Sequence, residues 1–432
     1  MRNCRILLVV MLLFLLQQPL FSQNTKIKTW SEKELLASKA LKQAHVGICI
    51  YEPATNKYWY NYQEDHYFTP ASNTKIFSLY TGMLLLGDSL PALRYLDTDS
   101  VLYVQGTADP AFLHPDYTLQ PAFRLLQQTN KKIEIVPAKN ENARFGYGWS
   151  WNDYADYYQS ELNEWPMYGN VARVRHHGDS LYIVPKLYEL TTNKDNQLTS
   201  LEVKRDERNN RFSMGYNSTI YKPEEEEVPF ITGGLEDLAL RLQDTLHKPV
   251  YIARQVPAGL QLMKGIPSDS LFLPMMHRSD NFFAEQTLMM CANQLFDTIS
   301  TQHMISYMLD HYLKELPDTP NWADGSGLSR YNLFSPRDFV YVLANMYKTY
   351  PTSRLYSLFA TGGKGTLKNY YKEQFVHAKT GTLTGVVALS GYLVTKKNKT
   401  LVFSVLVNNH NNSASTVRRE VEHFLTQVYE NY

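Results

Sequence analysis

Residues 71–86 read Ala-Ser-Asn-Thr-Lys-Ile-Phe-Ser-Leu-Tyr-Thr-Gly-Met-Leu-Leu-Leu, between Pro70 and Gly87. The proline start, the almost wholly apolar body and the glycine end predict a buried central helix. Ser72 and Lys75 are three residues apart, so on a helix they share a face and the amine can reach the hydroxyl. The helix dipole would also favour an anion developing on Ser72. Alone, a Ser-x-x-Lys pair is weak evidence, because it arises about once or twice by chance in a chain of ordinary composition.

Two further motifs follow in order along the chain. Ser279-Asp280-Asn281 precedes Phe-Phe-Ala-Glu-Gln, and Lys379-Thr380-Gly381 lies on an expected strand. A given tripeptide occurs by chance in roughly one such chain in ten, so coincidence does not account for all three motifs in this order. Together they form the signature of class A β-lactamases and penicillin-binding proteins. The motifs therefore indicate acyl transfer through a serine nucleophile.

The first two motifs contain residue types that acyl transfer requires. A serine hydroxyl attacks only after a base takes its proton, and an amine serves as that base only when its pKa is lowered. We expect burial and the nearby charge of Lys379 to lower the pKa of Lys75, the candidate base. Ser279 can relay a proton to the leaving amine, while Asn281 holds a substrate amide or carbonyl. Asp280 is expected to turn outward or to brace its loop.

The third motif is expected to hold the substrate. Lys379 and Thr380 offer a cation and a hydroxyl to a terminal carboxylate. Gly381 lets the strand lie close to the substrate backbone. The backbone N–H of Thr382 would form an oxyanion hole together with that of Ser72.

Composition excludes several classes of protein. The chain has 43 basic and 42 acidic residues, so nothing indicates a nucleic-acid partner. Cys49 and Cys291 lie in apolar surroundings and are too few for a disulfide framework, so the core must be stable without one. The histidines show no spacing typical of metal ligands, and we expect no metal.

Residues 1–22 predict an exported protein. Arg2 and Arg5 precede an apolar run over 6–16, which is too short to cross a bilayer. This pattern indicates a secretory signal peptide and a periplasmic location. An uncleaved N-terminal anchor is the alternative, because Leu20 is larger than the residue usual three places before a cleavage point. Association with a membrane surface is therefore also considered.

Strand and helix patterns at both ends of the mature chain predict one antiparallel sheet layer. Residues 45–52 with 57–62, and 386–395 with 400–408, have the composition of two hairpins. An apolar stripe at helical spacing near the C-terminus predicts a helix that packs on that sheet. Its residues are Val417, Val421, Phe424, Leu425 and Val428.

Two local signals concern the remaining segments. Ser31, with Glu34 three residues later, predicts a capping box that opens a second helix beside the sheet. The acidic run 224–227 indicates a solvated loop. It lies within a long middle region that contains many short strand-like pieces and no internal repeat.

These patterns predict an α+β fold with a discontinuous domain. We expect 23–90 and 265–432 to form the domain that contains all three motifs. Residues 91–264 would then be a large, mostly β insertion between the first and second motifs, which are 207 positions apart.

The whole mature chain resembles the DacB-type D-Ala-D-Ala carboxypeptidase/endopeptidase family, the low-molecular-mass class C penicillin-binding proteins of peptidase family S13. Besides the three motifs, Asp-Gly-Ser-Gly-Leu-Ser-Arg at 324–330 with Asn332, and Gly-Thr-Leu at 365–367, are similar to segments of that family. Ser326 itself is expected to lie in a turn, because Gly-Ser-Gly without a nearby base is usually a turn.

The resemblance implies a β-lactamase/transpeptidase-like domain, in which an antiparallel sheet is flanked by helices and joined to a helical subdomain. It also implies a large inserted domain and no cofactor. The implied substrates are peptidoglycan stem peptides, cut through an acyl-enzyme on Ser72, with β-lactam antibiotics as covalent inhibitors. The oligomeric state and the balance of carboxypeptidase and endopeptidase activity stay open.

Residues 148–154, Gly-Trp-Ser-Trp-Asn-Asp-Tyr, resemble a segment of the family's insertion in which an acidic side chain faces the active site. The resemblance makes Asp153 a candidate for reading the free amino group of the diamino acid in the stem peptide. Trp149, Trp151 and Tyr154 would wall a pocket around that charge pair. A loop-capping aspartate is the alternative interpretation.

Two other functions are weighed against a D-Ala-D-Ala peptidase. A β-lactamase of class A needs a water-activating glutamate on a loop, and the sequence does not place one. A related serine esterase falls in the same alternative. A non-catalytic cell-wall binding protein would be free to lose Lys75 or Lys379, yet both are present.

Overall fold

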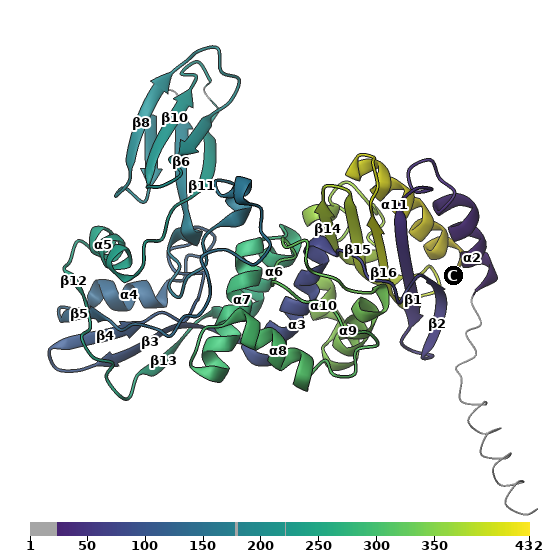
Figure 1. Ribbon diagram of the computed structural model, residues 1–432, viewed down its shortest axis with the longest axis horizontal. Coiled ribbons are helices and arrows are strands. Elements are labelled where there is room, and N and C mark those ends of the chain that lie inside the picture. The colour runs from purple at the N-terminus through teal and green to yellow at the C-terminus, as the bar shows by residue number, and fades with distance from the viewer. Residues whose placement is uncertain (1–23, 178–179, 221) are drawn as a thin grey trace, which may run out of the picture.

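The computed structural model describes residues 24–177, 180–220 and 222–432. The predicted signal peptide, residues 1–22, lies outside this part of the chain. Within the described ranges, no helix is both long enough and apolar enough to cross a bilayer. The molecule is elongated, with an antiparallel sheet at one end, helices in the middle and β-rich lobes at the other end (Figure 1).

A five-stranded antiparallel sheet joins the two ends of the chain in the order β14-β15-β16-β1-β2. The strands run Val376–Leu383 (β14), Val386–Val394 (β15), Thr400–Asn408 (β16), His45–Glu52 (β1) and Lys57–Tyr62 (β2). Both predicted hairpins are confirmed. Strand β1 pairs with β16 from His45 opposite Asn408 to Tyr51 opposite Val402. Segments more than 300 residues apart therefore build one sheet.

Helices cover both faces of this sheet. On one face, Ile48 and Ile50 share a core with α11 (Ala414–Asn431). On the opposite face, Cys49 shares a core with α9 (Pro336–Thr349). The alternation follows from the two-residue period of a strand. The predicted C-terminal stripe is confirmed, because all of its members are buried: Val417, Val421, Phe424, Leu425 and Val428.

The helical part of the molecule surrounds one buried helix. Its helices are α3 (Lys75–Leu85), α6 (Ser268–His277), α7 (Asn281–Phe296), α8 (Thr301–His311) and α10 (Thr352–Leu358). The predicted central helix is α3, although a 3-10 turn, Ala71–Thr74, replaces its first turn. Gly82 allows close packing here, since a Cβ at this position would lie 2.8 Å from Phe272 and from Thr287.

Between the first and second motifs the chain builds a β-rich region (Figure 1). One sheet, in the order β12-β5-β4-β3-β13, mixes parallel and antiparallel pairs. Its strands and the helices of the same segment are β3 (Ser89–Asp97), β4 (Val101–Gln105), β5 (Lys132–Ile135), β12 (Val250–Ile252), β13 (Gln261–Pro267), α4 (Pro121–Gln128) and α5 (Leu235–Leu246). Strands β3 and β13 pair, so the chain leaves and rejoins the helical part at neighbouring points.

A smaller lobe within this region holds two three-stranded sheets, β11-β6-β7 and β8-β10-β9. The strands run Val171–His177 (β6), Ser180–Val184 (β7), Glu189–Lys194 (β8), Glu202–Arg205 (β9), Arg211–Tyr216 (β10) and Glu224–Pro229 (β11). The extent of the inserted domain, 91–264, remains our proposal. The mixed sheet that contains its first and last strands begins at Ser89 and ends at Pro267.

The capping-box prediction for Ser31 is wrong. The helix begins earlier, as α2 (Thr25–Trp30), and Asn24 caps it by accepting from the backbone N–H of Lys26 at 3.1 Å. Ser31 is buried and opens a π-helical turn, Ser31–Leu35, that continues this helix. Glu34 instead accepts from Gln427 of α11 at 2.6 Å. Asparagine caps a helix as well as serine does, so Asn24 starts the helix before Ser31 is reached.

The acidic run 224–227 is strand β11 and not a solvated loop. It pairs with β6, and the register places Glu227 opposite Arg173 and Glu225 opposite Arg175. Arg173 donates to Glu227 at 2.6 Å, and Arg175 forms an ion pair with Glu225. Opposite charges across an antiparallel pair are favourable, so the partner strand neutralises two of the carboxylates.

Candidate active site

A cleft of about 650 Å³ lies where the 3-10 turn, the N-terminus of α7, strand β14 and the loop after β5 meet. Most of the residues predicted from the sequence line it: Ser72, Asp153, Ser279, Asn281, Thr380 and Thr382. Lys75 and Lys379 are fully buried beneath its surface. The three motifs are thus brought together around one cavity.

The amine of Lys75 lies at the centre of the polar contacts below the cleft. Its Nζ donates to Ser72 Oγ at 3.0 Å, to Asn281 Oδ1 at 2.6 Å and to the Ser326 carbonyl at 2.6 Å. Three acceptors match the three N–H groups of an ammonium. When the amine is neutral, its lone pair can face the Ser72 hydroxyl.

Burial lowers the pKa of Lys75 to about 8, although the carboxylates of Asp324, Glu285 and Asp280 oppose the shift. The pKa of Lys379 is also lowered, well below its usual value, first by burial and then by the charge of Lys75. An amine with a pKa near 8 is neutral in a substantial fraction of molecules near neutral pH. The geometry and the lowered pKa of Lys75 therefore fit a base for Ser72.

The second motif forms a turn at the start of α7. Asp280 caps this helix by accepting from the backbone N–H of Phe283 at 3.0 Å, so it braces the loop as expected. Ser279 has a φ of 65°, which turns the chain sharply before the helix. The Asn281 amide accepts from Lys75 and donates to the Tyr158 carbonyl at 3.0 Å. A substrate group that binds the Asn281 amide N–H would have to displace the Tyr158 carbonyl.

The third motif lies on β14, as predicted. Lys379 Nζ donates to Ser279 Oγ at 2.8 Å and to the Thr380 carbonyl at 2.8 Å. Its amine is therefore directed at Ser279 and has no surface in the open cleft. A Cβ at Gly381 would lie 2.6 Å from the Pro70 carbonyl. The glycine thus lets β14 approach the turn that carries Ser72, whereas the sequence suggested an approach to substrate.

Sequence reasoning missed several cations that line the cleft. They are Arg278, Arg330 and Arg418. Arg418 extends from α11 and donates to the hydroxyl of Thr382. Arg330 donates to the Thr384 carbonyl at 3.2 Å. Arg330 belongs to the quoted 324–330 segment, but no local pattern marks Arg418, because the fold alone places it opposite β14.

Asp153 is the last residue of a 3-10 turn, Trp151–Asp153, and it lines the cleft. The aromatic residues expected beside it have other contacts. Trp149 Nε1 donates to Asp324 at 2.9 Å, and the Trp151 ring is 63% exposed and stacks on Tyr154. The aromatic residues that line the cleft together with Asp153 are Tyr157 and Tyr158.

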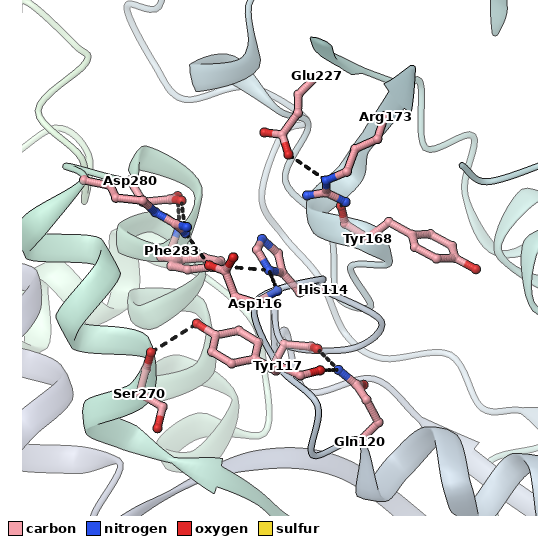
Figure 2. A network of polar contacts seen from close by, with 12 residues as sticks. His114, Asp116, Tyr117, Gln120, Tyr168, Arg173, Glu227, Ser270, Asp280 and Phe283 are labelled. Carbon is pink, nitrogen blue, oxygen red and sulfur yellow. Dashed lines mark hydrogen bonds and ion pairs between the residues drawn. The ribbon is translucent and has the colours of Figure 1, made fainter. Parts of the chain in front are cut away.

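Polar contacts tie the inserted region to the second motif (Figure 2). Asp116 forms an ion pair of 2.6 Å with Arg278, the residue before Ser279. Tyr117 donates to the Ser270 carbonyl on α6 at 3.2 Å. A second cavity of about 300 Å³ lies beside this network, and burial lowers the pKa of His114 in its wall to about 3. The inserted region thus fixes the turn that carries Ser279.

The sequence was compared with models of known families. The model described as the D-Ala-D-Ala carboxypeptidase 3 (S13) family matches residues 31–202 and 239–428, which is most of the chain. The chain belongs to the S13 family. The unmatched segment, 203–238, contains β10 and β11, so this S13 chain departs from the family model mainly within the smaller lobe.

Two curated relatives are similar along most of their length. Penicillin-sensitive carboxypeptidase A of Dictyostelium discoideum is 22% identical, over 83% of this chain and 82% of the relative. D-alanyl-D-alanine carboxypeptidase DacB of Haemophilus influenzae is 22% identical, over 91% of this chain and 92% of the relative.

Solved structures show the same fold. The crystal structure of penicillin binding protein 4 (dacB) from Haemophilus influenzae superposes with a TM-score of 0.72 at 21% identity, over 94% of this chain and 99% of that one. The same protein complexed with a β-lactam gives a TM-score of 0.64 at 19% identity, over 94% of this chain and 99% of that one. The predicted α+β, transpeptidase-like fold class is therefore confirmed.

Proposed function

We propose that Ser72 is the nucleophile of this S13 serine D-Ala-D-Ala carboxypeptidase, and that its substrates are peptidoglycan stem peptides. The observation that carries the proposal is the contact of 3.0 Å between Ser72 Oγ and the buried Lys75 amine, whose pKa is lowered to about 8. A base near neutral pKa, within reach of a serine in a cleft, is the arrangement that acyl transfer needs.

The proposed reaction begins when neutral Lys75 takes the Ser72 proton. The Ser72 oxygen then bonds to the carbonyl carbon between the two D-alanines, and the backbone N–H groups of Ser72 and Thr382 hold the oxyanion. The C–N bond breaks as the Lys75 ammonium returns this proton through the Ser279 hydroxyl to the leaving amine, so that Lys75 is neutral again and Ser279 keeps a proton. Lys379 Nζ donates to Ser279 Oγ at 2.8 Å and thereby orients that hydroxyl. Water later hydrolyses the Ser72 ester and restores the enzyme.

The terminal carboxylate of the substrate would bind beside β14. Thr380 and Thr382 line the cleft there, and Arg418 contacts the Thr382 hydroxyl. We assign the direct charge contact to Arg418, while buried Lys379 acts from below the cleft surface. Substrates or inhibitors with a free carboxylate would gain from the Arg418 cation.

We further propose that the chain acts in the periplasm. Support comes from the leader pattern of residues 1–22 and from its DacB relative, which is named a D-alanyl-D-alanine carboxypeptidase. A solved relative complexed with a β-lactam supports covalent inhibition by this class of antibiotic. Among the described residues that line the cleft there is no glutamate to activate water, as a class A β-lactamase requires. We therefore expect the β-lactam ester to be long-lived.

Penicillin is expected to form one long-lived adduct, on Ser72. A β-lactam ring places a reactive amide where the D-Ala-D-Ala bond lies, and its leaving group stays tethered. Peptide mapping by mass spectrometry after treatment with penicillin checks the position. Loss of the adduct in Ser72→Ala, with retention in Ser326→Ala, is the matched comparison. An adduct on Ser326 or Ser279, or none, would contradict the assignment.

Asp153 is proposed to read the free amino group of the diamino acid in the stem peptide, because its carboxylate borders the cleft beside Tyr157 and Tyr158. We expect Asp153→Asn to lower turnover of peptides that carry this amine by roughly 5-fold, corresponding to an ion pair of about 1 kcal/mol. Penicillin lacks the amine, so acylation of Ser72 should stay nearly unchanged. Steady-state turnover and penicillin labelling are compared in one preparation.

Asp99→Asn is the matched control, because this exposed aspartate of the inserted region does not line the cleft. Equal losses on peptide and penicillin in Asp153→Asn would show that Asp153 supports the fold instead. No loss on either would make it a surface loop residue.

A further inference from the structure

A loop that takes no part in the proposed reaction lies directly beneath Lys75. We call residues 324–329 the wedge loop. The Ser326 carbonyl accepts from Lys75 Nζ at 2.6 Å, and the Gly325 carbonyl accepts from Ser78 Oγ at 2.6 Å. Lys75 and Ser78 are one turn apart on α3. Two successive carbonyls of the wedge loop are thus bound by the helix that carries the base.

The other side of the same two peptides is bound by Glu285 of α7. Its carboxylate accepts from the backbone N–H of Gly325 at 2.9 Å and from that of Ser326 at 2.7 Å. Glu285 is 1% exposed and lies four residues after Asn281, so both side chains share a face of α7. Of the three groups that accept from Lys75, two, Asn281 and Ser326, are therefore held in place by one face of α7.

The wedge loop has no room to shift toward either neighbour. A Cβ at Gly325 would lie 2.9 Å from the Ala284 carbonyl on α7. A Cβ at Gly327 would lie 1.9 Å from the Ala71 carbonyl, beside Ser72. The loop therefore fills the space between α7 and the turn that carries the nucleophile.

A second buried carboxylate closes the wedge loop on itself. Asp324 accepts from the backbone N–H of Gly327 at 2.7 Å, from that of Ser329 at 2.6 Å and from Asn332 at 2.7 Å. Asp324 also accepts from Trp149, and none of its hydrogen-bond partners lies on α7. Glu285 is therefore the side chain of α7 that binds the wedge loop.

We propose that Glu285 is a positioning residue for the base: it fixes the Gly325 and Ser326 peptides so that the Ser326 carbonyl keeps the Lys75 amine beside Ser72. The inference rests on the proposed role of Lys75 and deepens it. Glu285 belongs to none of the three motifs from which the reaction was assigned, and Glu285 does not line the cleft.

Charge adds a measurable consequence. Lys75 faces the carboxylates of Glu285, Asp324 and Asp280, each of which raises its pKa, and it repels Lys379. Burial, followed by the charge of Asp324, raises the pKa of Glu285 itself to about 8. Glu285 therefore acts on Lys75 as a charge only at pH values where its carboxyl group is ionised. Removing the Glu285 charge must lower the pKa of Lys75, because a negative neighbour that favours the ammonium is lost.

The test uses the whole protein labelled with ¹³C at lysine Cε, with the Lys75 signal assigned by its loss in Lys75→Ala. In Glu285→Gln we expect the titration midpoint of Lys75 to move to lower pH. Acylation of Ser72 by penicillin should fall at least about tenfold, because the amide keeps the shape but offers only one acceptor. A lower pKa leaves more of the Lys75 amine neutral, which by itself would speed acylation of Ser72. Slower acylation together with a lower pKa would therefore show that Glu285 acts by positioning Lys75 and not through its charge.

Asp109→Asn is the matched control. Asp109 is also a buried carboxylate with a pKa raised to about 7, and it accepts from the backbone N–H of Ala111 outside the site. Both the Lys75 midpoint and the acylation rate should stay at their wild-type values in this variant. Thermal melting of each variant reports the folded fraction.

Glu285→Asp provides a second route if Glu285→Gln does not fold. The shorter side chain keeps the charge but cannot reach both N–H groups, so acylation should fall while the Lys75 midpoint moves less. An unchanged midpoint in Glu285→Gln, or wild-type acylation per folded molecule in either variant, would overturn the inference. If wild-type protein carries no penicillin on Ser72, the proposed function fails, while the Lys75 titration still decides the placement of Glu285.

Discussion

Lys75→Ala is expected to slow acylation of Ser72 by penicillin by about 10² to 10⁴-fold, the range that a positioned general base contributes. The variant removes the amine that lies 3.0 Å from Ser72 Oγ, and no other amine donates to that oxygen in the described part of the chain. The time course of adduct formation, followed by intact-protein mass spectrometry, measures the rate.

Two comparisons make the Lys75 result interpretable. Lys348→Ala removes an exposed lysine of α9 and should acylate at the wild-type rate. Thermal melting of Lys75→Ala tells loss of chemistry from loss of fold. If folded Lys75→Ala still forms the adduct at close to the wild-type rate, another group is the base and the assignment is wrong.

Gly327→Ala is expected to have the second large effect. Gly327 has a φ of 81°, and a Cβ there would lie 1.9 Å from the Ala71 carbonyl. Either the wedge loop or the Ser72 turn must then move by more than about 1 Å, and misplacement on that scale costs about 10²-fold in rate. Penicillin acylation and thermal melting are measured together.

Gly259→Ala is the control that separates the steric clash of a new Cβ from the free-energy cost of a positive φ at alanine. Gly259 also has a positive φ, of 88°, yet a Cβ there meets nothing within 4 Å. It should lose only about 1–2 kcal/mol of stability, the cost of a left-handed alanine, with acylation unchanged. Equal behaviour of the two variants would show that the close approach of Gly327 to Ala71 has no bearing on the nucleophile.

Local patterns were sufficient wherever one segment carries its own periodicity. The strand-like runs of the hairpins, the stripe of α11 and the helix after Ser72 all appear in the structure where the sequence predicts them. The sequence also placed the three motifs correctly: the first lies in the turn before α3, the second at the start of α7 and the third on β14. Their individual catalytic roles remain predictions.

Long-range placement accounts for what the sequence did not reveal. Arg418 reaches Thr382 only because α11 packs across the sheet, and Glu285 holds the wedge loop across 40 positions of chain. The direction of the Lys379 amine toward Ser279 depends on how β14 meets α7. The charge run 224–227 misled because its partners, on β6, lie about 50 residues earlier.

The pairing of β1 with β16 affects how the chain folds during synthesis. During synthesis β1 emerges early, but its neighbour β16 is among the last elements to appear. Until then one edge of the β1–β2 hairpin has no partner, and unpaired edges invite association with other chains. The catalytic cleft also lacks β14 and Arg418 until this late stage. The complete cleft can therefore form only once nearly the whole chain is available for folding.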